Sequence, residues 1–293
     1  MPFGTVTLND GTKDVTAYVE QAIDVGFSHI DTAQYYRTEE YIGAAIRESG
    51  LARSELYITT KFSGISTPKY AIENSLDKLG VESVDLYLIH NPSSLILFPN
   101  TWSDFEKFRE QGLVKSIGVS NFNLSQLQKL VSTAKVIPAV NQINLSPYNY
   151  AEKKDLLDFA AKNGIVVEAY SSLSPITQYP GGPVDAPVNA AAKRLGATPT
   201  QVILSWVRSK GVVIVTTSST KEHMQEYLAV ADLPSLTDDE IAAIDEAGAR
   251  GPPSLLLRVR DLTPLKSWES IKLFMMFVVL EAVFYCSTRY FYG

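Results

Sequence analysis

Short apolar runs rich in Val, Ile and Tyr alternate with longer stretches of helical spacing along most of this chain of 293 residues. Several of the short runs are almost continuously apolar, as strands buried on both faces of a parallel sheet are. The predicted strands cover residues 3–5, 27–32, 56–62, 84–90, 114–121, 136–143, 165–171 and 212–218. The predicted helices cover residues 15–25, 38–49, 68–79, 102–111, 124–133, 153–163, 188–209 and 221–231. This alternation indicates an α/β fold with parallel strands.

Seven clear strand–helix units and a short opening strand make eight units. At roughly thirty residues a unit, they match the size of a (β/α)8 TIM barrel. A doubly wound open sheet is the alternative, but no Gly-rich fingerprint follows an early strand. In a barrel, the functional side chains are expected at the carboxyl ends of the strands. We therefore predict one barrel domain over residues 1–250.

Composition and charge narrow the class of protein further. Lys and Arg number 26 against 32 Asp and Glu, a formal charge of -6, whereas a nucleic-acid-binding protein normally presents a basic face. The one cysteine, Cys286, has no internal partner for a disulfide, and no charged-then-apolar leader opens the chain. We therefore expect a globular protein of a reducing, cytoplasmic compartment, with no nucleic acid as a partner.

Polar or ionisable side chains follow the predicted strands at their carboxyl ends. They are Asp31, Lys61, His90, Ser120, Asn121, Gln142 and Tyr170. Taken singly, each has an ordinary structural explanation, such as a helix cap for Asp31 or a core histidine for His90. Taken together on one rim of a barrel, they predict a functional site. Because buried charge is costly unless it is paired, Asp31 and Lys61 on neighbouring strands are expected to compensate each other.

The loop after Asp31 carries two tyrosines, Tyr35 and Tyr36. A phenol with a pKa of about 10 is a poor acid at neutral pH unless a nearby cation stabilises its anion, and Lys61 is placed to lower that pKa. A neutral imidazole at His90 would orient a carbonyl oxygen beside the phenol. This combination predicts a general-acid site that reduces a carbonyl group, provided that a bound cofactor supplies hydride.

Six motifs, each at a strand end, resemble those of the aldo-keto reductase family and occur in the family's order. They are the segments 26–33 (GFSHIDTA), 58–61 (ITTK), 85–90 (DLYLIH), 117–122 (IGVSNF), 140–143 (VNQI) and 168–171 (EAYS). The resemblance extends from Phe3 to about Gly248. It implies a catalytic tetrad of Asp31, Tyr36, Lys61 and His90, with Tyr36 rather than Tyr35 as the proton donor.

The resemblance also implies a cofactor, NADPH, with NADH as the alternative, bound in extended form without a Rossmann domain. Thr5 would lie near the nicotinamide ribose, and Tyr170 would stack on the nicotinamide ring. The implied partners of the carboxamide are Ser120, Asn121 and Gln142, and Ser171 belongs to the same cofactor-binding set.

The segment 215–223 matches the family's phosphate-binding loop with two differences. Thr217 stands where a Lys is common, and His223 stands where an Arg is common. A neutral His lacks the bidentate, charge-assisted contacts that an Arg makes to a 2′-phosphate. Ser218 and the amides at the start of the following helix would still hold a phosphate, and Glu226 would contact the adenine.

The composition changes after Gly251-Pro252-Pro253. We predict a linker with basic residues over 251–272 and an additional apolar helix over 273–293, interrupted by Glu281. The uninterrupted apolar run is shorter than the roughly 20 residues that a membrane span prefers, although counting through Tyr292 makes a span feasible. Two interpretations stand: a transmembrane or interfacial helix that anchors a cytosol-facing enzyme to an endomembrane, and a helix that covers the barrel.

The expected function is NAD(P)H-dependent reduction of aldehydes or ketones to alcohols, with hydride from the nicotinamide and the proton from Tyr36. The expected partner is a small carbonyl substrate; no metal site is predicted, and a monomer is expected. The alternative is a non-catalytic nucleotide-binding regulatory subunit on the same barrel, which could lose its proton donor without losing its function. A glycosidase would need two opposed carboxylates at the strand ends, and there only Asp31 is convincing.

Overall fold

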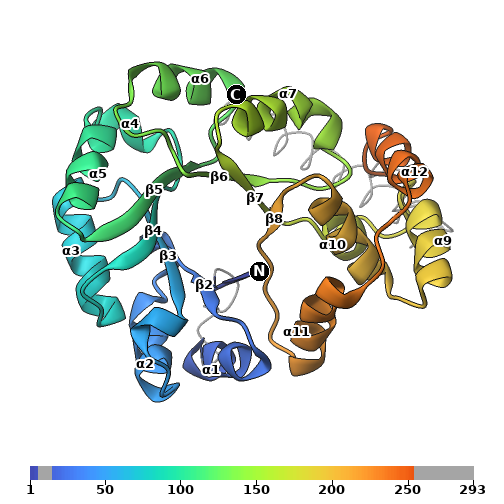
Figure 1. Cartoon of the computed structure of the whole chain (residues 1–293), viewed down its shortest axis with the longest axis horizontal. Helices are drawn as coiled ribbons and strands as arrows, with labels where there is room; N and C mark the ends of the chain where they lie inside the picture. Colours follow the sequence, from blue (N-terminus) through green and yellow to red (C-terminus); the bar gives the residue numbers. More distant parts are fainter. Residues whose placement is uncertain (6–14, 254–293) are drawn as a thin grey trace, which may run out of the picture. The chain divides into compact units, whose positions relative to one another are not determined.

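Parallel strands pair in chain order, each with the next along the sequence, in the computed structural model, which describes residues 1–5 and 15–253. The strands are β1 (Pro2–Gly4), β2 (His29–Asp31), β3 (Tyr57–Phe62), β4 (Val84–Ile89), β5 (Val114–Ser120), β6 (Val140–Asn144), β7 (Val166–Tyr170) and β8 (Val213–Ile214). Phe3 forms a parallel bridge with Thr216, just after β8, and the Gly4 amide donates to the Thr216 carbonyl oxygen at 2.7 Å. The sheet thereby closes, and the predicted (β/α)8 barrel is confirmed (Figure 1).

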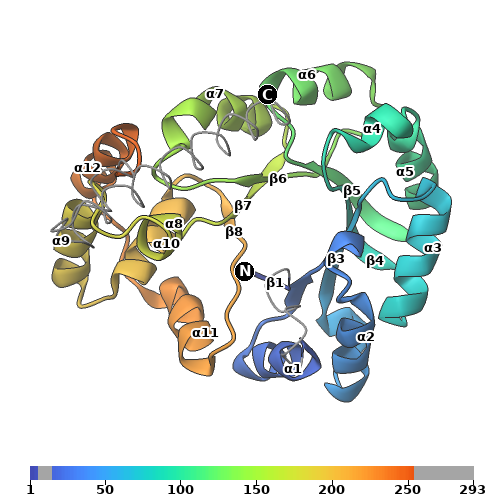
Figure 2. The ribbon, with the colours of Figure 1, turned by 180° about the vertical axis from the view of Figure 1, so that it is seen from behind.

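Helices surround the strands when the barrel is seen from either end (Figure 1 and Figure 2). The α-helices are α1 (Val15–Val25), α2 (Glu39–Glu48), α3 (Pro68–Leu79), α4 (Ser94–Leu97), α5 (Thr101–Glu110), α6 (Leu124–Thr133), α7 (Tyr150–Lys162), α8 (Ser174–Thr177), α9 (Asp185–Leu195), α10 (Pro199–Ser209), α11 (Lys221–Leu228) and α12 (Asp238–Ala249). Short 3₁₀ turns are η2 (Gln34–Tyr36), η3 (Arg53–Glu55) and η4 (Ala229–Asp232). Every predicted strand is present within a few residues of its predicted bounds.

Helix α3 illustrates how local sequence signals determine the bounds of an element. The Thr67 hydroxyl accepts a hydrogen bond from the Tyr70 amide, and Pro68 takes the first helical position, where its missing N–H would have no helical partner. Gly80 follows the last residue with a φ of 67°, a left-handed conformation in which glycine has no Cβ to clash. The predicted range, 68–79, is confirmed.

The single helix predicted over 188–209 is wrong, because the chain forms α9 and α10 there. Gly196 ends α9 in a left-handed conformation, and the Thr198 hydroxyl caps α10 by accepting from the Gln201 amide. Apolar residues keep their helical spacing through this break, so the hydrophobic periodicity alone does not indicate where one helix ends and the next begins. Helices α4, α8 and α12 were also missed. The first two are four residues long, whereas α12 begins at a capping box that the sequence contains.

Successive residues of each strand point alternately toward the helices and into the barrel. On β4, Tyr87 belongs to the main apolar core, whereas Leu86 and Leu88 form a separate cluster with Val140. Gly118 on β5 is required beside this cluster, because a Cβ there would lie 2.7 Å from the Val140 carbonyl oxygen. Other buried strand positions carry polar side chains, and these build the site described below.

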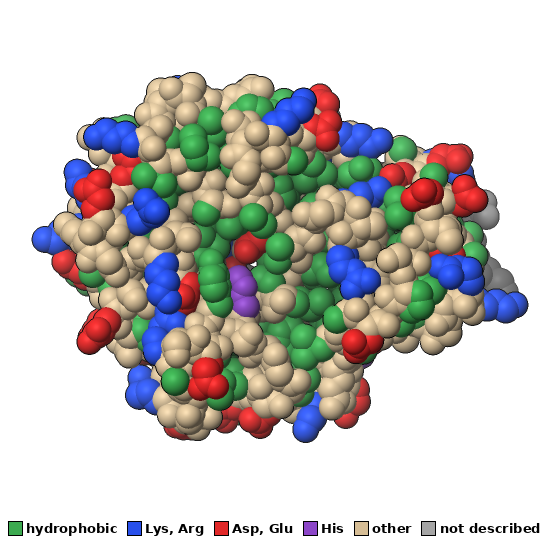
Figure 3. Space-filling view, in the orientation of Figure 1, with side chains coloured by type: hydrophobic (Ala, Val, Ile, Leu, Met, Phe, Trp, Pro, Cys, Tyr) green, Lys and Arg blue, Asp and Glu red, His purple; other side chains and the backbone are tan. Residues whose placement is uncertain are grey.

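The predicted apolar helix and candidate membrane anchor over 273–293 lie outside the described residues, as does nearly all of the linker over 251–272. Within the ranges 1–5 and 15–253, no helix is both long enough and apolar enough to cross a membrane. Residues 1–252 belong to one structural unit. On the face of this unit drawn in Figure 3, acidic and basic side chains are interspersed around the periphery, and hydrophobic side chains gather toward a central hollow.

Candidate active site

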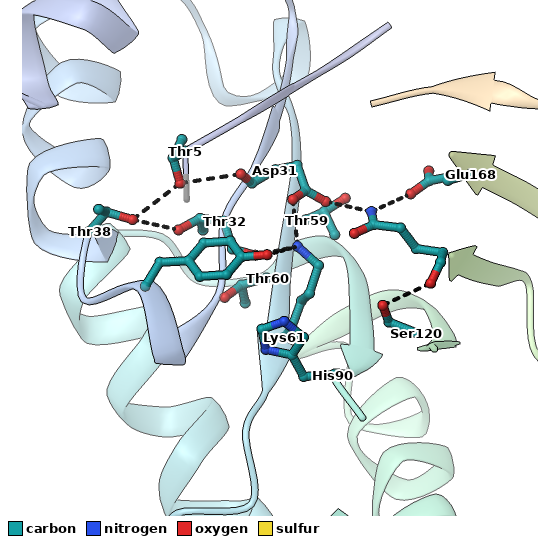
Figure 4. A network of polar contacts seen from close by, with 12 residues as sticks. Thr5, Asp31, Thr32, Thr38, Thr59, Thr60, Lys61, His90, Ser120 and Glu168 are labelled. Carbon is teal, nitrogen blue, oxygen red and sulfur yellow. Dashed lines mark hydrogen bonds and ion pairs between the residues drawn. The ribbon is translucent and has the colours of Figure 1, made fainter. Parts of the chain in front are cut away.

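A buried ion pair lies at the centre of the site. Lys61, on β3, donates from Nζ to Asp31 Oδ1 at 2.5 Å and to the Thr32 carbonyl oxygen at 2.9 Å (Figure 4). The lysine side chain is completely buried, and 3% of the aspartate side chain is exposed. Burial alone would lower the pKa of Lys61, but the Asp31 carboxylate raises this pKa above its usual value, so the ammonium keeps its charge. The two side chains compensate each other, as expected.

Tyr36 lies at the end of η2, in the turn that follows β2. Lys61 Nζ donates to Tyr36 Oη at 3.4 Å and lies 5.0 Å from the centroid of the phenol ring. Arg37, the next residue, has a φ of 57°, a left-handed conformation that turns the chain sharply after the phenol. Tyr35 is 68% exposed, whereas Tyr36 is half-buried. The structure therefore brings Tyr36, and not Tyr35, to the ammonium.

The pKa of the Tyr36 phenol does not shift in the expected direction. Burial raises this pKa above its usual value more than the nearby Lys61 ammonium lowers it. Lys61 lowers the pKa as predicted, but the prediction left out the desolvation of the phenolate, which outweighs the effect of Lys61. Since the pKa is raised, the phenol keeps its proton at neutral pH, as a proton donor must.

His90 follows β4 and faces the same phenol. Its ring lies 5.4 Å from the Tyr36 ring, centroid to centroid, in an edge-on arrangement. Burial, followed by repulsion from the Lys61 ammonium, lowers the pKa of His90 to about 4. The imidazole is therefore neutral at physiological pH, as expected, and can donate from one ring nitrogen and accept at the other.

Polar side chains from β5 and β7 form the neighbouring wall. Asn121 Nδ2 donates to the His90 carbonyl oxygen at 3.0 Å, and Tyr170 Oη donates to Asn121 Oδ1 at 2.7 Å. Ser120 Oγ donates to the Gln142 carbonyl oxygen at 2.8 Å. Asn121 and Ser171, which directly follow β5 and β7, have φ values of 63° and 56°, both left-handed conformations. Left-handed conformations cost energy in residues other than glycine and persist only where the surrounding structure enforces them. They are common at functional sites.

Gln142 joins this wall to the ion pair. Its Nε2 donates to Asp31 Oδ2 and to Glu168 Oε2, each at 2.8 Å. Glu168, which is 3% exposed, has no role predicted from the sequence. An acidic residue within the apolar strand Val166–Tyr170, two positions before an implied cofactor residue, is the signal that could have identified it.

These side chains surround a cavity of about 660 Å³, within the usual range for small-molecule sites. The predicted residues that line it are Asp31, Tyr36, His90, Ser120, Asn121, Gln142, Tyr170, Ser171 and Thr217. Among the described residues, the buried hydroxyls of Ser172 and Thr217, which both line the cavity, have no hydrogen-bond partner. A dinucleotide would supply partners for such hydroxyls and an aromatic face for Tyr170, so the lining fits NADPH.

Four implied cofactor residues do not line the cavity. The Thr5 hydroxyl contacts Thr38 and the Asp31 carbonyl oxygen, and Gly4 lines the cavity in its place. Ser218 is engaged in its own turn, where its Oγ accepts from the Thr220 amide at 3.1 Å.

The other two implied cofactor residues lie on α11. The His223 ring stacks on Tyr227, and Glu226 accepts a hydrogen bond from the Thr198 hydroxyl of the neighbouring helix. The first contact lies within α11, between residues four apart, and the second joins the start of α10 to α11.

One wall of the cavity was missed altogether. It is formed by the residues after β7, in and around α8, namely Ser172, Leu173, Ser174, Thr177 and Gln178. A Ser-rich segment with Pro175 at a helix start was the available signal.

A sequence profile described as the Aldo/keto reductase family matches residues 1–249. The chain is 39% identical over 244 residues to the NAD/NADP-dependent indole-3-acetaldehyde reductase of Schizosaccharomyces pombe, covering 82% of this chain and 84% of that protein. It is similar to the crystal structure of an aldo/keto reductase from Brucella melitensis, with a TM-score of 0.76 and 34% identity over 84% of this chain and 93% of that chain. It is also similar to a Bombyx mori aldo-keto reductase in complex with NADP, with a TM-score of 0.74 and 31% identity over 84% and 88% of the two chains.

Proposed function

The chain belongs to the aldo/keto reductase family, and from that premise we propose which of its residues carry out the reaction. The protein is an NAD(P)H-dependent oxidoreductase that reduces aldehydes or ketones to alcohols. We propose that Tyr36 donates the proton to the carbonyl oxygen and that His90 orients the carbonyl group. Lys61 stabilises the phenolate that remains, and Asp31 keeps the Lys61 ammonium in place. The observation that carries this assignment is the contact of a buried, paired ammonium with the Tyr36 phenol at 3.4 Å.

Bound NADPH supplies the hydride. In our proposal, the Tyr170 ring covers one face of the nicotinamide, and Ser120, Asn121 and Gln142 hydrogen-bond its carboxamide. Holding the donor and the carbonyl in contact supplies a large part of the rate advantage. Thr217, whose hydroxyl is buried without a partner among the described residues, is the residue of the predicted phosphate loop that we assign to the phosphates.

The proton moves from Tyr36 Oη to the carbonyl oxygen as negative charge develops there. The neutral imidazole of His90 donates a hydrogen bond to the same oxygen, which holds the carbonyl beside the phenol. The phenolate that remains lies beside the Lys61 ammonium, which stabilises it electrostatically. Asp31 keeps the ammonium in place through the contact at 2.5 Å.

Coenzyme titration followed by an aldehyde panel tests this function. We expect NADPH to quench the fluorescence of the full chain and to be oxidised when an aldehyde is added. The panel includes indole-3-acetaldehyde, the substrate named for the S. pombe relative. Binding of neither NADPH nor NADH would contradict the proposal.

We further propose that the apolar segment 273–293 attaches the enzyme to a membrane surface or spans the membrane. The proposal rests on the composition of this segment, in which apolar residues, interrupted by Glu281, follow the basic residues of 251–272. The alternative, a helix that covers the barrel, predicts a protein with no membrane affinity.

A further inference from the structure

A carboxyl group without an assigned role lies just beneath the cavity. Glu168 is 3% exposed and precedes Tyr170 by two residues on β7, so the two side chains point to the same side of the strand. Glu168 does not line the cavity itself. A buried carboxyl group needs a hydrogen-bond partner, and the side-chain partner of Glu168 is Gln142, which does line the cavity.

The Gln142 amide contacts two carboxyl groups at once. Its Nε2 donates to Asp31 Oδ2 and to Glu168 Oε2, each at 2.8 Å (Figure 4 labels both acids). A side-chain amide has two N–H donors and one carbonyl oxygen, so these contacts use both donors. The carbonyl oxygen is then the group that Gln142 has left for a ligand in the cavity.

We propose that Glu168 is a positioning residue for the coenzyme. It holds the Gln142 amide in one orientation, so that the carbonyl oxygen accepts a hydrogen bond from the carboxamide N–H of the nicotinamide. The inference rests on the proposed function, because it requires the nicotinamide to lie beside Gln142. Without an acceptor at position 168, one amide N–H would lack a partner in the barrel interior, and the orientation would no longer be unique.

The charge balance of the barrel interior agrees with this role. With Asp31 and Lys61 both ionised, an ionised Glu168 would add an uncompensated buried negative charge. Burial, followed by repulsion from Asp31, raises the pKa of Glu168 to about 7, while Gln142, Lys61 and the amino group of Met1 oppose that rise. A neutral carboxyl still accepts from Gln142, so a glutamine at this position can replace it.

The test compares NADPH affinity across variants of the full chain, by fluorescence titration without a carbonyl substrate. Glu168→Gln keeps an acceptor and is expected to bind within about twofold of wild type. Glu168→Met removes the acceptor and is expected to bind roughly fivefold to tenfold more weakly, the range for one lost hydrogen bond.

The matched control is Glu39, another buried carboxyl, at 2% exposure, which accepts from Thr60 Oγ1 at 2.7 Å. It lies outside the cavity lining. Glu39→Met also removes a buried acceptor and is expected to lower the free energy of unfolding without changing NADPH affinity.

Equal NADPH affinity of Glu168→Met and wild type would overturn the inference, as would an equal loss of affinity in Glu39→Met or Glu168→Gln. If Glu168→Met does not fold, Glu168→Asp takes its place. It keeps the carboxyl group but withdraws the acceptor by one methylene, with the same expected loss and the same contradicting result. Since no proton transfer occurs in the titration, a wrong assignment of Tyr36 leaves this result intact, whereas a wild-type protein that binds no NADPH contradicts the proposed function instead.

Discussion

Asp31 and Lys61 depend on each other, because both charged side chains are almost completely buried. Lys61→Met would leave the Asp31 carboxylate buried without its cation, and we expect the free energy of unfolding to fall by about 3–5 kcal/mol. The double variant Asp31→Asn/Lys61→Met removes both charges and should recover most of that loss. Neither variant should reduce aldehydes at the wild-type rate, because both lack the ammonium beside the phenol. Urea unfolding and steady-state rates measure the two effects, and a single variant as stable as wild type would contradict the account.

The lowered pKa of His90 makes a prediction about stability against pH. The unfolded chain binds a proton at His90 below about pH 6.5, whereas the folded protein, with a pKa of about 4, does not. Between these values the unfolded state binds more protons, so acidification destabilises the fold, by roughly 2–3 kcal/mol for this group at pH 4.5.

Urea unfolding of wild type and His90→Gln at pH 7 and pH 4.5 measures this contribution. His29, whose pKa is also lowered to about 4, and Glu168 titrate in both proteins and cancel in the comparison. We expect His90→Gln to lose less stability on acidification. An equal loss in the two proteins would show that His90 has its ordinary pKa.

At the residue scale, the Asp31–Lys61 pair was predictable because two opposite charges end neighbouring strands. The choice of Tyr36 over Tyr35 came from the family resemblance and not from the residues alone. The sequence did not predict the direction of the Tyr36 pKa shift. Desolvation depends on everything packed around the phenol, which no local pattern records. Glu168 was missed for a related reason, because its role comes from a contact with Gln142 on a neighbouring strand.

Among the elements, the loop between β8 and α11 and the start of α11 depart from the family's pattern at two positions, where Thr217 and His223 stand in place of common basic residues. We predict that Thr217→Lys strengthens NADPH binding about tenfold, because an ammonium makes a charge-assisted contact to the 2′-phosphate. NADH lacks that phosphate and is the internal control, so its affinity should stay unchanged. Fluorescence titration with both coenzymes measures the two affinities. Equal gains for the two coenzymes would indicate that the phosphate lies elsewhere.

The sequence predicted the strands better than the helices that follow β7. Buried parallel strands are short apolar runs with clear ends, and each predicted one is present. The break between α9 and α10 depends on a glycine and a threonine cap that interrupt the backbone but not the apolar spacing. Helix α8 is a single turn whose residues matter because they line the cavity.

For the whole molecule, the barrel was predictable because the number, order and size of its strand–helix units can be read from the hydrophobic pattern of the sequence. The attachment of residues 273–293 to a membrane stays a prediction. We expect the full chain to sediment with lipid vesicles in high salt, and a chain ending at residue 272 to stay in the supernatant. Glu281→Leu, which removes the interrupting carboxylate, should strengthen sedimentation. A full chain that stays wholly in the supernatant would exclude the anchor.

The most direct test of the proposed chemistry compares two adjacent phenols in a single turnover. Tyr36→Phe and Tyr35→Phe are each saturated with NADPH and mixed rapidly with an aldehyde, and coenzyme oxidation is followed by absorbance. We predict that Tyr36→Phe binds NADPH with near wild-type affinity but reacts at least about 100-fold more slowly, since a general acid contributes about 10²–10⁴-fold. Tyr35→Phe, which changes a side chain that is 68% exposed, should react at nearly the wild-type rate. A wild-type rate in Tyr36→Phe, or the larger loss in Tyr35→Phe, would contradict the account.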